Sequence, residues 1–465
     1  MRLVASCVAC DKQRIRAPRV PARRGAFFGN PWWIPPFLGR VPAVEERLVS
    51  LLGLVSLALF FESYDISMLT AALGHIARDL GMEEASLGSY LGLIRLGALP
   101  VILTIPFADR IGRRRVFLAT LVGASVGTLA TAFTQTATQF TVVQMVTRVF
   151  LVMGGAVAVV IVTEEFPAAH RGWAVGMLGA LSACGHGLGA ILFSRIDSLP
   201  YGWRSLYVVG IVPLLVLPLM RRRVQETARF ARQDVGRQSL AVELRGWHQP
   251  LLRLVRDSPR RAILLTLAAG LFAIGDSPVY QFTGYFTQTV LGWTPGQYAA
   301  MVLGGGAIGI VGNVVAGRLG DRVGRRLVGL AFLAVYPLSA GILYHGPAWS
   351  VPVGFALFVF CETAAQVIFR ALSTELFPTS HRGTAAGWIA LIQALGWSAG
   401  LWLAGAMTGV WGTLFDATSI LSLASLAGGL FLLFLPETRQ RELEEISGER
   451  PPQAETPAAT VRRRR

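Results

Sequence analysis

The sequence predicts an all-α membrane protein in which twelve transmembrane helices form two pseudo-symmetric six-helix bundles. Of its 465 residues, 53% are hydrophobic and only 15% are charged, and the mean hydropathy is +0.52. A soluble protein of this size would need more charge to cover its surface. Apolar runs reach the roughly 20 residues that a helix needs to cross a bilayer. A third observation is an internal repeat, with its copies 211 residues apart.

Apolar windows between turn and charge signals predict the helices in order. Six are expected at 48–72, 87–108, 116–134, 139–162, 173–194 and 202–220. Six more are expected at 262–285, 298–316, 327–345, 351–372, 384–408 and 417–435. The chain therefore divides into a basic, disordered tail (1–47), a first bundle (48–220), a cytoplasmic connector (221–261), a second bundle (262–435) and a second cytoplasmic tail (436–465).

The distribution of arginine predicts the orientation in the membrane. The net charge of +16 is concentrated in both tails and in the loops at 109–115, 221–261 and 318–326. The alternate loops at 135–138, 287–297 and 346–350 contain no Lys or Arg. Because basic loops stay on the cytoplasmic side, both termini are expected in the cytoplasm, and the protein in the inner or plasma membrane. The charge thus indicates contact with anionic lipid rather than with nucleic acid.

The internal repeat joins several separate motifs at nearly one offset. Residues 163–172, with the pattern TExFPxxHRG, return as residues 374–383. The loop DRIGRR at 109–114 returns as DRVGRR at 321–326, one residue farther along. Three single features also recur 211 positions later: Asp65 as Asp276, Glu226-Thr227 as Glu437-Thr438, and the helical glycines 176, 185 and 189 as 387, 396 and 400. We expect these glycines to allow close approach of neighbouring helices.

These motifs resemble those of the major facilitator superfamily. The loop signature G-x-x-x-D-R-x-G-R-[RK] is matched from Gly317 to Arg326, whereas the first copy has Ile105 in place of the opening glycine. The E-x-F-P-x-x-x-R-G segments and the closing Pro436-Glu437-Thr438 are similar to the sugar-porter and metabolite:proton-symporter branches. The resemblance implies alternating access, with two halves moving around a central substrate site.

The resemblance also implies a cytoplasmic gate of ion pairs and helix-end contacts. Exposed ion pairs contribute only about 0–1 kcal/mol each, so a group of them can bias two states without locking either. The alternative is that these residues act only as topology signals. The expected gate residues are Asp109, Arg110, Gly112, Arg113, Glu164 and Arg171, with Asp321, Arg322, Gly324, Arg325, Glu375 and Arg382.

Ionisable residues inside the predicted helices are candidates for function, because each costs roughly 2.5–3.5 kcal/mol to place in the hydrocarbon. Asp65 is the first candidate for a proton carrier, since low dielectric favours the protonated carboxyl group and related symporters carry an aspartate in this stretch. The alternative is a permanent ion pair with Arg95. Glu62, one turn earlier, is the second candidate. Asp276 is the third, although it could instead bond the backbone opened by Pro278.

Two arginines are the candidate binders of a substrate anion, because a guanidinium group matches the two oxygens of a carboxylate. These are Arg95 and Arg370; the latter shares a helical face with Glu362 and Gln366, and an internal Glu362–Arg370 pair is the alternative. Arg148 is expected to be structural. His186 is either a core hydrogen-bonding group or a substrate contact. Further polar and aromatic candidates for substrate contact, or for packing, are Tyr280, Gln281, Tyr285, Gln393 and Trp397.

The sequence predicts a secondary active transporter and gives no sign of an enzyme. The phosphate-binding pattern GxxxxGK[ST] is absent, and four scattered cysteines, with one CxxC at Cys7 and Cys10, indicate neither a disulfide framework nor a metal site. No cofactor, metal or catalytic residue is expected. The favoured function is proton-coupled uptake of a small organic metabolite by a monomer, with an organic or aromatic carboxylate ahead of a sugar. The alternatives are a sugar porter, coupled or facilitative, and a proton-coupled exporter of drugs or metabolites.

Overall fold

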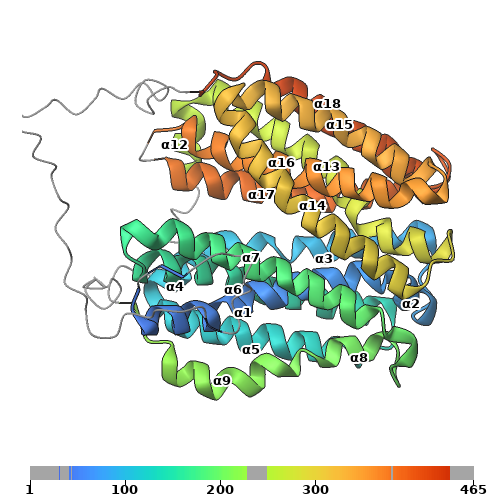
Figure 1. Cartoon of the computed structure of the whole chain (residues 1–465), viewed down its shortest axis with the longest axis horizontal. Coiled ribbons are helices and arrows are strands. Elements are labelled where there is room, and N and C mark those ends of the chain that lie inside the picture. The colour runs from blue at the N-terminus through green and yellow to red at the C-terminus, as the bar shows by residue number, and fades with distance from the viewer. Residues whose placement is uncertain (1–30, 32–40, 43, 228–248, 379–380, 440–465) are drawn as a thin grey trace, which may run out of the picture.

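The computed structural model describes residues 31, 41–42, 44–227, 249–378 and 381–439. Most of the predicted tails and about half of the predicted connector lie outside these residues. Within them the chain is helical, with no strand. Two groups of helices lie one above the other in Figure 1, the first half of the chain below and the second half above.

The first half contains six membrane-length segments, of which three are interrupted. Their bounds are α1 (Glu46–Ala71) with the short α2 (Leu73–Asp79), α3 (Glu84–Leu96) with η2 (Leu99–Leu103) and α4 (Thr104–Ile111), α5 (Arg113–Thr131), α6 (Ala137–Glu165), α7 (Ala168–Phe193) followed by η3 (Ile196–Ser198), and α8 (Trp203–Val208) with α9 (Ile211–Arg223).

The second half contains six longer helices, preceded by a short one. Their bounds are α12 (Gln249–Asp257), α13 (Pro259–Thr289), α14 (Pro295–Arg322), α15 (Arg325–His345), η4 (Ala348–Ser350), α16 (Val351–Glu375), α17 (Arg382–Met407) and α18 (Leu414–Leu432). Ten helices of the described chain are long and apolar enough to cross a membrane. With the interrupted α3–α4 segment and α5, which begins with three arginines, the twelve predicted crossings are present.

The second predicted helix, 87–108, is not continuous. It consists of α3, a 3₁₀ turn and α4, and the break begins at Gly97. Pro100 lies at the start of the 3₁₀ turn and has no N–H to continue the α-helix. Gly97 also lies against α6, where an added Cβ would be only 2.3 Å from the Met145 carbonyl oxygen. The prediction of an unbroken helix was therefore wrong at this point.

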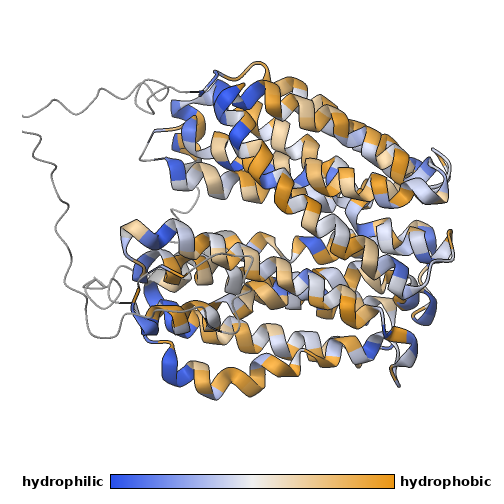
Figure 2. Cartoon of the chain, viewed as in Figure 1, coloured by the Kyte–Doolittle hydropathy of each residue, from blue (hydrophilic) through white to orange (hydrophobic). Residues whose placement is uncertain are grey.

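Charged residues gather at one end of the helices, here called the basic end. Figure 2 shows hydrophilic residues concentrated where α4, α12 and the end of α9 lie. The loops that follow α4, α9 and α14 are at this end, together with their arginines. The short helix α12, in the segment expected as a connector, is fastened there by a 3.1 Å contact between Asp257 Oδ2 and His381 Nε2 at the start of α17.

The two halves meet at the end opposite to the basic end. Ser398 Oγ donates a hydrogen bond of 2.7 Å to the Gly92 carbonyl oxygen, and Gln288 Nε2 donates one of 2.7 Å to the Ala71 carbonyl oxygen. A Cβ added to Gly88 would lie 2.2 Å from the Leu401 carbonyl oxygen, so α3 and α17 touch along their backbones.

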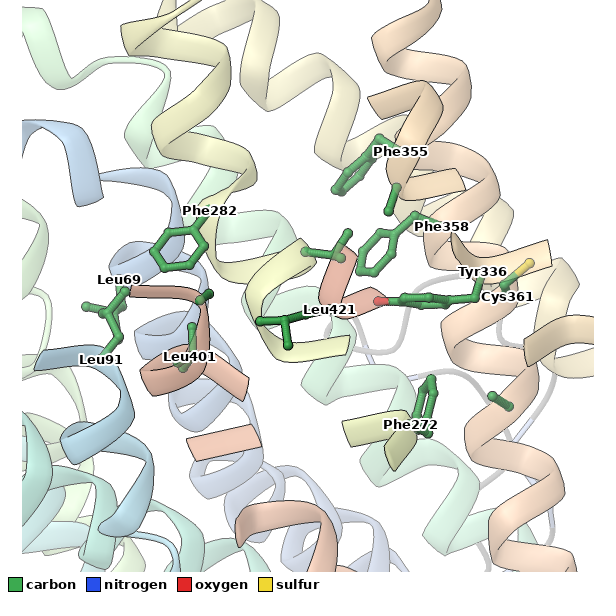
Figure 3. Close-up of a cluster of buried hydrophobic side chains, with 14 of the residues drawn as sticks. Leu69, Leu91, Phe272, Phe282, Tyr336, Phe355, Phe358, Cys361, Leu401 and Leu421 are labelled. Atoms are coloured by element: carbon green, nitrogen blue, oxygen red, sulfur yellow. The ribbon is translucent and has the colours of Figure 1, made fainter. Parts of the chain in front are cut away.

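A hydrophobic cluster continues through this contact. Figure 3 shows Leu69 and Leu91 of the first half beside Phe282 and Leu401 of the second, and all four side chains are buried. Burial of apolar surface at this end holds the halves together. The contacts described here therefore characterise a state that is closed opposite the basic end.

Candidate functional site

A cavity of about 350 Å³ lies between the two halves, roughly midway along the helices. Its first-half wall comes from α1, α3 and α7, and its second-half wall from α13, α14, α16 and α17. Of the residues predicted from sequence, six line it: Arg95, His186, Asp276, Tyr280, Glu362 and Trp397. This volume falls within the range of about 300–1,000 Å³ that is usual for small-molecule sites.

Asp276 is held from two sides in the second-half wall. Its Oδ1 accepts a hydrogen bond of 2.9 Å from the Tyr336 hydroxyl of α15, and its Oδ2 accepts one of 2.9 Å from Trp397 Nε1 of α17. Asp276 is only 5% exposed. The expected alternative, that its carboxylate satisfies the backbone opened by Pro278, does not describe these contacts, because both oxygens bond side chains of other helices.

Arg95 connects the two halves at the cavity. It extends from α3 of the first half, and its Nη2 donates a hydrogen bond of 3.2 Å to Gln281 Oε1 of α13. Its guanidinium carbon lies 5.8 Å from the centre of the Trp397 ring, close enough for a cation–π interaction. The contacts of Arg95 thus differ from the permanent Asp65–Arg95 pair considered above. The same tryptophan contacts both the arginine and Asp276.

Aromatic rings form much of the remaining wall. His186 of α7 and Tyr280 of α13 meet edge to face with ring centres 6.3 Å apart. Tyr280 in turn stacks on Phe358 of α16 at 6.2 Å. Glu362 and Asn313 add polar groups on α16 and α14. A cation beside flat aromatic surfaces is suited to a planar anion, which it can bind by charge and by stacking.

Asp65 and Glu62 lie outside the cavity lining, inside the first half. Asp65 is 1% exposed, and its Oδ1 accepts a hydrogen bond of 3.4 Å from Gln144 Nε2, which also bonds Thr131 Oγ1 at 3.1 Å. Arg148 of α6 is a charged neighbour of both carboxylates, and Glu62 also has Arg95 and Asp65 as charged neighbours. Asp65 Oδ2 is buried without a hydrogen-bond partner. This is an unusual condition for a buried carboxylate oxygen.

The other predicted candidates lie away from the cavity wall. Gln281 is fully buried behind it and bonds Arg95. Gln393 Nε2 bonds Gln366 Oε1 at 3.2 Å, between α17 and α16. Tyr285 stacks on Phe415 at 6.2 Å, near the end opposite the basic end. Arg370, two turns beyond Glu362 on α16, is exposed and is not part of this lining.

The basic end of the first half is fastened by a cluster that we call the first clamp, formed by Arg113, Glu164, Glu226 and Thr227. Arg113 Nη2 lies 3.1 Å from Glu164 Oε1, and Thr227 Oγ1 donates a hydrogen bond of 2.6 Å to Glu164 Oε2. Glu226 Oε1 accepts a hydrogen bond of 3.2 Å from the backbone N–H of Arg114. This clamp ties α5, α6 and the segment after α9 together.

The second clamp repeats this arrangement with Arg325, Glu375, Glu437 and Thr438. Arg325 Nη2 lies 2.9 Å from Glu375 Oε1, and Thr438 Oγ1 bonds Glu375 Oε2 at 2.6 Å. Glu437 Oε1 accepts a hydrogen bond of 2.9 Å from the backbone N–H of Arg325. Asp321 adds a contact of 3.0 Å to Arg325. Each clamp joins helices of its own half.

The remaining expected gate residues lie at the same end. Gly112 and Gly324 precede α5 and α15 with φ of 106° and 123°, a conformation that favours glycine. Arg110 and Arg322 are exposed, and Arg171 and Arg382 lie in the first turns of α7 and α17. Arg382 Nε and Nη2 are buried without a hydrogen-bond partner. Asp109 lies in α4, and its side chain is outside the described part of the structure.

Sequence reasoning missed Gln144 and Tyr336 as partners of the two aspartates, and it gave Arg148 only a structural role. Gln144 and Arg148 lie four residues apart on α6 and so face the same neighbour, a spacing that could have linked them to Asp65. Tyr336 offered a weaker signal, because a single tyrosine in an apolar helix is usually a packing residue. Among the described residues, no group of three His, Cys, Asp or Glu side chains is placed to hold a metal ion.

Comparison with known proteins identifies the family. The sequence description of the Major Facilitator Superfamily matches residues 55–335 and 286–465. A gallate transporter of Pseudomonas putida is 26% identical over 85% of this chain and 94% of its own length. A 3-(3-hydroxy-phenyl)propionate transporter of Escherichia coli is 25% identical over 85% of this chain and 96% of its own.

A solved structure shows the same fold. The crystal structure of a D-xylose-proton symporter superposes with a TM-score of 0.70, at 18% identity, over 85% of this chain and all of that chain. The predicted architecture of two six-helix bundles is thereby confirmed, and so is the prediction of a membrane transport protein rather than an enzyme. The chain, with its repeated loop motifs, paired clamps and central cavity, belongs to the major facilitator superfamily.

Proposed function

We propose that this protein takes up a small aromatic or unsaturated carboxylate together with a proton. The observation that carries the proposal is the cavity between the halves, where Arg95 lies over Trp397 and beside aromatic side chains. A guanidinium group stays charged at physiological pH and binds a carboxylate through two parallel hydrogen bonds. The names of two relatives, transporters of gallate and of 3-(3-hydroxy-phenyl)propionate, agree with such a substrate.

Arg95 binds the substrate carboxylate in this proposal, and Tyr280, His186 and Trp397 contact its ring. Arg95 belongs to the first half, whereas Trp397, Tyr280 and Gln281 belong to the second. A ligand placed among them contacts both halves, so that it contributes differently to the free energies of the two access states. The contacts opposite the basic end close that side in the state described here.

Asp65 carries the coupled proton in this proposal, with Glu62 and Asp276 as the secondary candidates. Its Oδ2 is buried without a hydrogen-bond partner, which makes protonation favourable, while Arg148 offers the charged form a neighbour. The membrane potential and proton gradient then supply about 2.3 kcal/mol per charge for each 100 mV. The two clamps and their neighbours serve as the gate at the basic end.

We also propose that the protein is a monomer in the bacterial inner membrane, with both termini in the cytoplasm. The support is the concentration of arginines at the basic end, which follows the positive-inside rule. On this orientation the described state is closed to the outside.

Uptake into proteoliposomes tests the substrate class. Labelled gallate, hydroxyphenylpropionate, nicotinate, muconate and xylose are offered under an imposed proton gradient. We expect accumulation of an aromatic or unsaturated acid, and its loss in Arg95→Gln. Arg370→Gln is the matched control, because Arg370 lies outside the cavity lining and should leave uptake largely intact. Transport of xylose alone would assign the protein to sugar porters, and outward pumping of amphipathic drugs would assign it to exporters.

A second variant tests the coupling residue. In Asp65→Asn the side chain no longer carries a proton to release, so we expect gradient-driven accumulation to disappear while exchange of internal for external substrate continues. The comparison of net uptake with exchange in the same vesicles measures this. Accumulation that persists in Asp65→Asn and is lost in Glu62→Gln or Asp276→Asn would move the role to that residue.

A further inference from the structure

A second cavity, separate from the central one, lies at the basic end of the first half. Its volume is about 430 Å³, and it is formed between the turn from α4 to α5 and the end of α9. Five arginines and one glutamate give it its charge: Arg110, Arg114, Arg115, Arg221, Arg222 and Glu226. The net charge of these lining residues is +4, five positive and one negative.

Two of these residues build the wall. The Arg114 side chain donates hydrogen bonds of 2.7 Å from Nε to the Val224 carbonyl oxygen and of 2.7 Å from Nη2 to the Arg221 carbonyl oxygen. Glu226 Oε1 accepts the backbone N–H of Arg114 at 3.2 Å and that of Thr227 at 3.3 Å. These bonds fix the end of α9 against the start of α5. The carboxylate of Glu226 is thereby directed to backbone donors.

The second half provides an internal comparison for this corner. Arg326 Nη2 bonds the Leu433 carbonyl oxygen, as Arg114 bonds that of Arg221, and Glu437 Oε2 accepts the backbone N–H of Arg326 at 3.4 Å. The fastening is therefore the same. At the loop offset of 212 residues, however, the positions of Arg115, Arg221 and Arg222 are occupied by Leu327, Leu433 and Phe434. The fold of this corner does not require the three additional arginines.

An apolar stripe leads along α9 to the cavity. Ile211, Leu215 and Leu219 are 40%, 70% and 48% exposed and follow one another at a spacing of four residues. Arg222 comes three residues after Leu219 and so continues the same face. In a membrane protein such a face is covered by acyl chains. A molecule lying on it would place its polar end at Arg222 and in the cavity.

We propose that this corner is a binding site for the phosphate headgroup of an anionic phospholipid, with phosphatidylglycerol as the simplest example. Guanidinium groups bind phosphate oxygens through paired, charge-assisted hydrogen bonds. Basic pockets at the membrane surface are suited to anionic headgroups. The apolar stripe of α9 accounts for the acyl chains, which a free phosphate lacks, and the second half, without the arginines, lacks the site.

Native mass spectrometry of the full chain in detergent tests this proposal. The protein is titrated with dioleoyl phosphatidylglycerol, and separately with dioleoyl phosphatidylethanolamine. We expect retained phosphatidylglycerol, and about tenfold weaker retention in Arg221→Gln/Arg222→Gln, since contacts to charged groups are removed. Arg318→Gln/Arg439→Gln is the matched control, because it removes two exposed arginines from the second half. Arg221→Lys/Arg222→Lys keeps the charge and should keep most of the binding.

Several results would overturn the assignment. Equal weakening in the two Gln variants would show that net charge alone attracts the lipid, and unchanged retention in both would remove the site. Equal retention of phosphatidylethanolamine would exclude recognition of an anion. Displacement of the lipid by millimolar inorganic phosphate would identify a phosphate site without a lipid. A thermal melt of each variant confirms folding. If Arg221→Gln/Arg222→Gln unfolds, retention of phosphatidylglycerol by Arg221→Lys/Arg222→Lys is measured in its place.

Discussion

Asp65 and Asp276 occupy equivalent positions in the two copies of the repeat and have different partners. Asp65 is contacted by Gln144 and has Arg148 as its charged neighbour, both from α6. Asp276 is contacted by side chains of α15 and α17. The repeat therefore fixes where each carboxylate lies, and the surrounding residues decide its chemistry. One carboxylate keeps a buried oxygen without a partner, whereas both oxygens of the other are hydrogen-bonded.

Trp397→Phe separates the two contacts of this tryptophan. The phenyl ring can still lie beneath Arg95, but the hydrogen bond to Asp276 Oδ2 is lost. Asp276 then competes more strongly for Arg95, and a lost hydrogen bond to a buried charged group costs about 1.5–3 kcal/mol. We expect the KM of uptake to rise about tenfold or more, with little change in maximal rate.

Trp388→Phe is the control for this change. Trp388 lies on the same helix, and its indole nitrogen bonds Thr266 Oγ1 at 2.7 Å, away from the cavity lining. Its loss should lower the melting temperature without raising KM. Similar KM values for both variants would remove Trp397 from substrate binding.

The sequence could nominate side chains for the cavity but could not rank them. Arg95 and Arg370 are both arginines within apolar helices, and the same argument selected both. The difference lies in their depth along the helix and in the facing helix, which depend on packing of distant segments. Tyr336, by contrast, was not nominated although it bonds a cavity residue. Nothing near it in the sequence indicates that its hydroxyl meets an aspartate 60 positions away.

At the scale of elements, glycine decides how closely helices approach. Gly400 of α17 faces α13, where an added Cβ would lie 2.1 Å from the Ile274 carbonyl oxygen. Gly387 lies on the same helix, and nothing comes within 4 Å of a Cβ added there. The sequence placed both in one repeated set with a single role. The structure divides the set, because close approach occurs only where two helices cross.

This difference predicts opposite effects for two alanine substitutions. Gly400→Ala forces the backbones of α13 and α17 apart, which should destabilise the protein by about 1–3 kcal/mol. Gly387→Ala replaces a poor helix former without a clash and should be neutral or stabilising by up to about 1 kcal/mol. Melting of the two purified variants in one detergent, followed by tryptophan fluorescence, measures both. A melting temperature for Gly400→Ala at or above that of Gly387→Ala would contradict the packing.

Helix existence followed from hydropathy, and helix continuity did not. The segment 87–108 satisfies the length and apolarity of a membrane span, and the prediction treated it as one rod. Its interruption depends on Pro100 and on a contact of Gly97 with α6, which is distant in sequence. Hydropathy averages over such local features, so it locates a span without showing where the helix breaks.

At the scale of the whole molecule, the state is defined by where the halves touch. Gly88 is a point of backbone contact between them, against Leu401 and Gly405. Gly88→Val should prevent this contact and shift the population toward a state open opposite the basic end. Gly176→Val is the control, because Gly176 lies in the same half and a Cβ there has no neighbour within 4 Å.

Thiol labelling reports this shift. A His186→Cys reporter in the central cavity, in a background with the four native cysteines replaced, is exposed to a membrane-impermeant reagent from the side opposite the basic end. We expect labelling to be faster in Gly88→Val than in Gly176→Val or the parent. Unchanged labelling in Gly88→Val would mean that this contact does not hold the closed state.

The two-bundle architecture could be predicted because hydropathy, arginine distribution and the internal repeat are all visible in short segments or at a fixed offset along the sequence. The contacts between the halves could not, because they belong to one of at least two states that the same residues support. Nothing in the sequence around Ser398 or Gly92, for example, indicates the hydrogen bond that joins them in this state.

The two clamps also bear on the history of the chain. Each clamp is completed by residues of its own copy, Thr227 closing on Glu164 and Thr438 on Glu375. A polypeptide of half this length would already possess everything needed to fasten its basic end, and two such polypeptides could have faced each other as separate subunits. The copies have since kept their fastenings and differ at their centres, where Arg148 in one corresponds to Val359 in the other. The present chain then joins two such copies, and each half was free to change separately from the other.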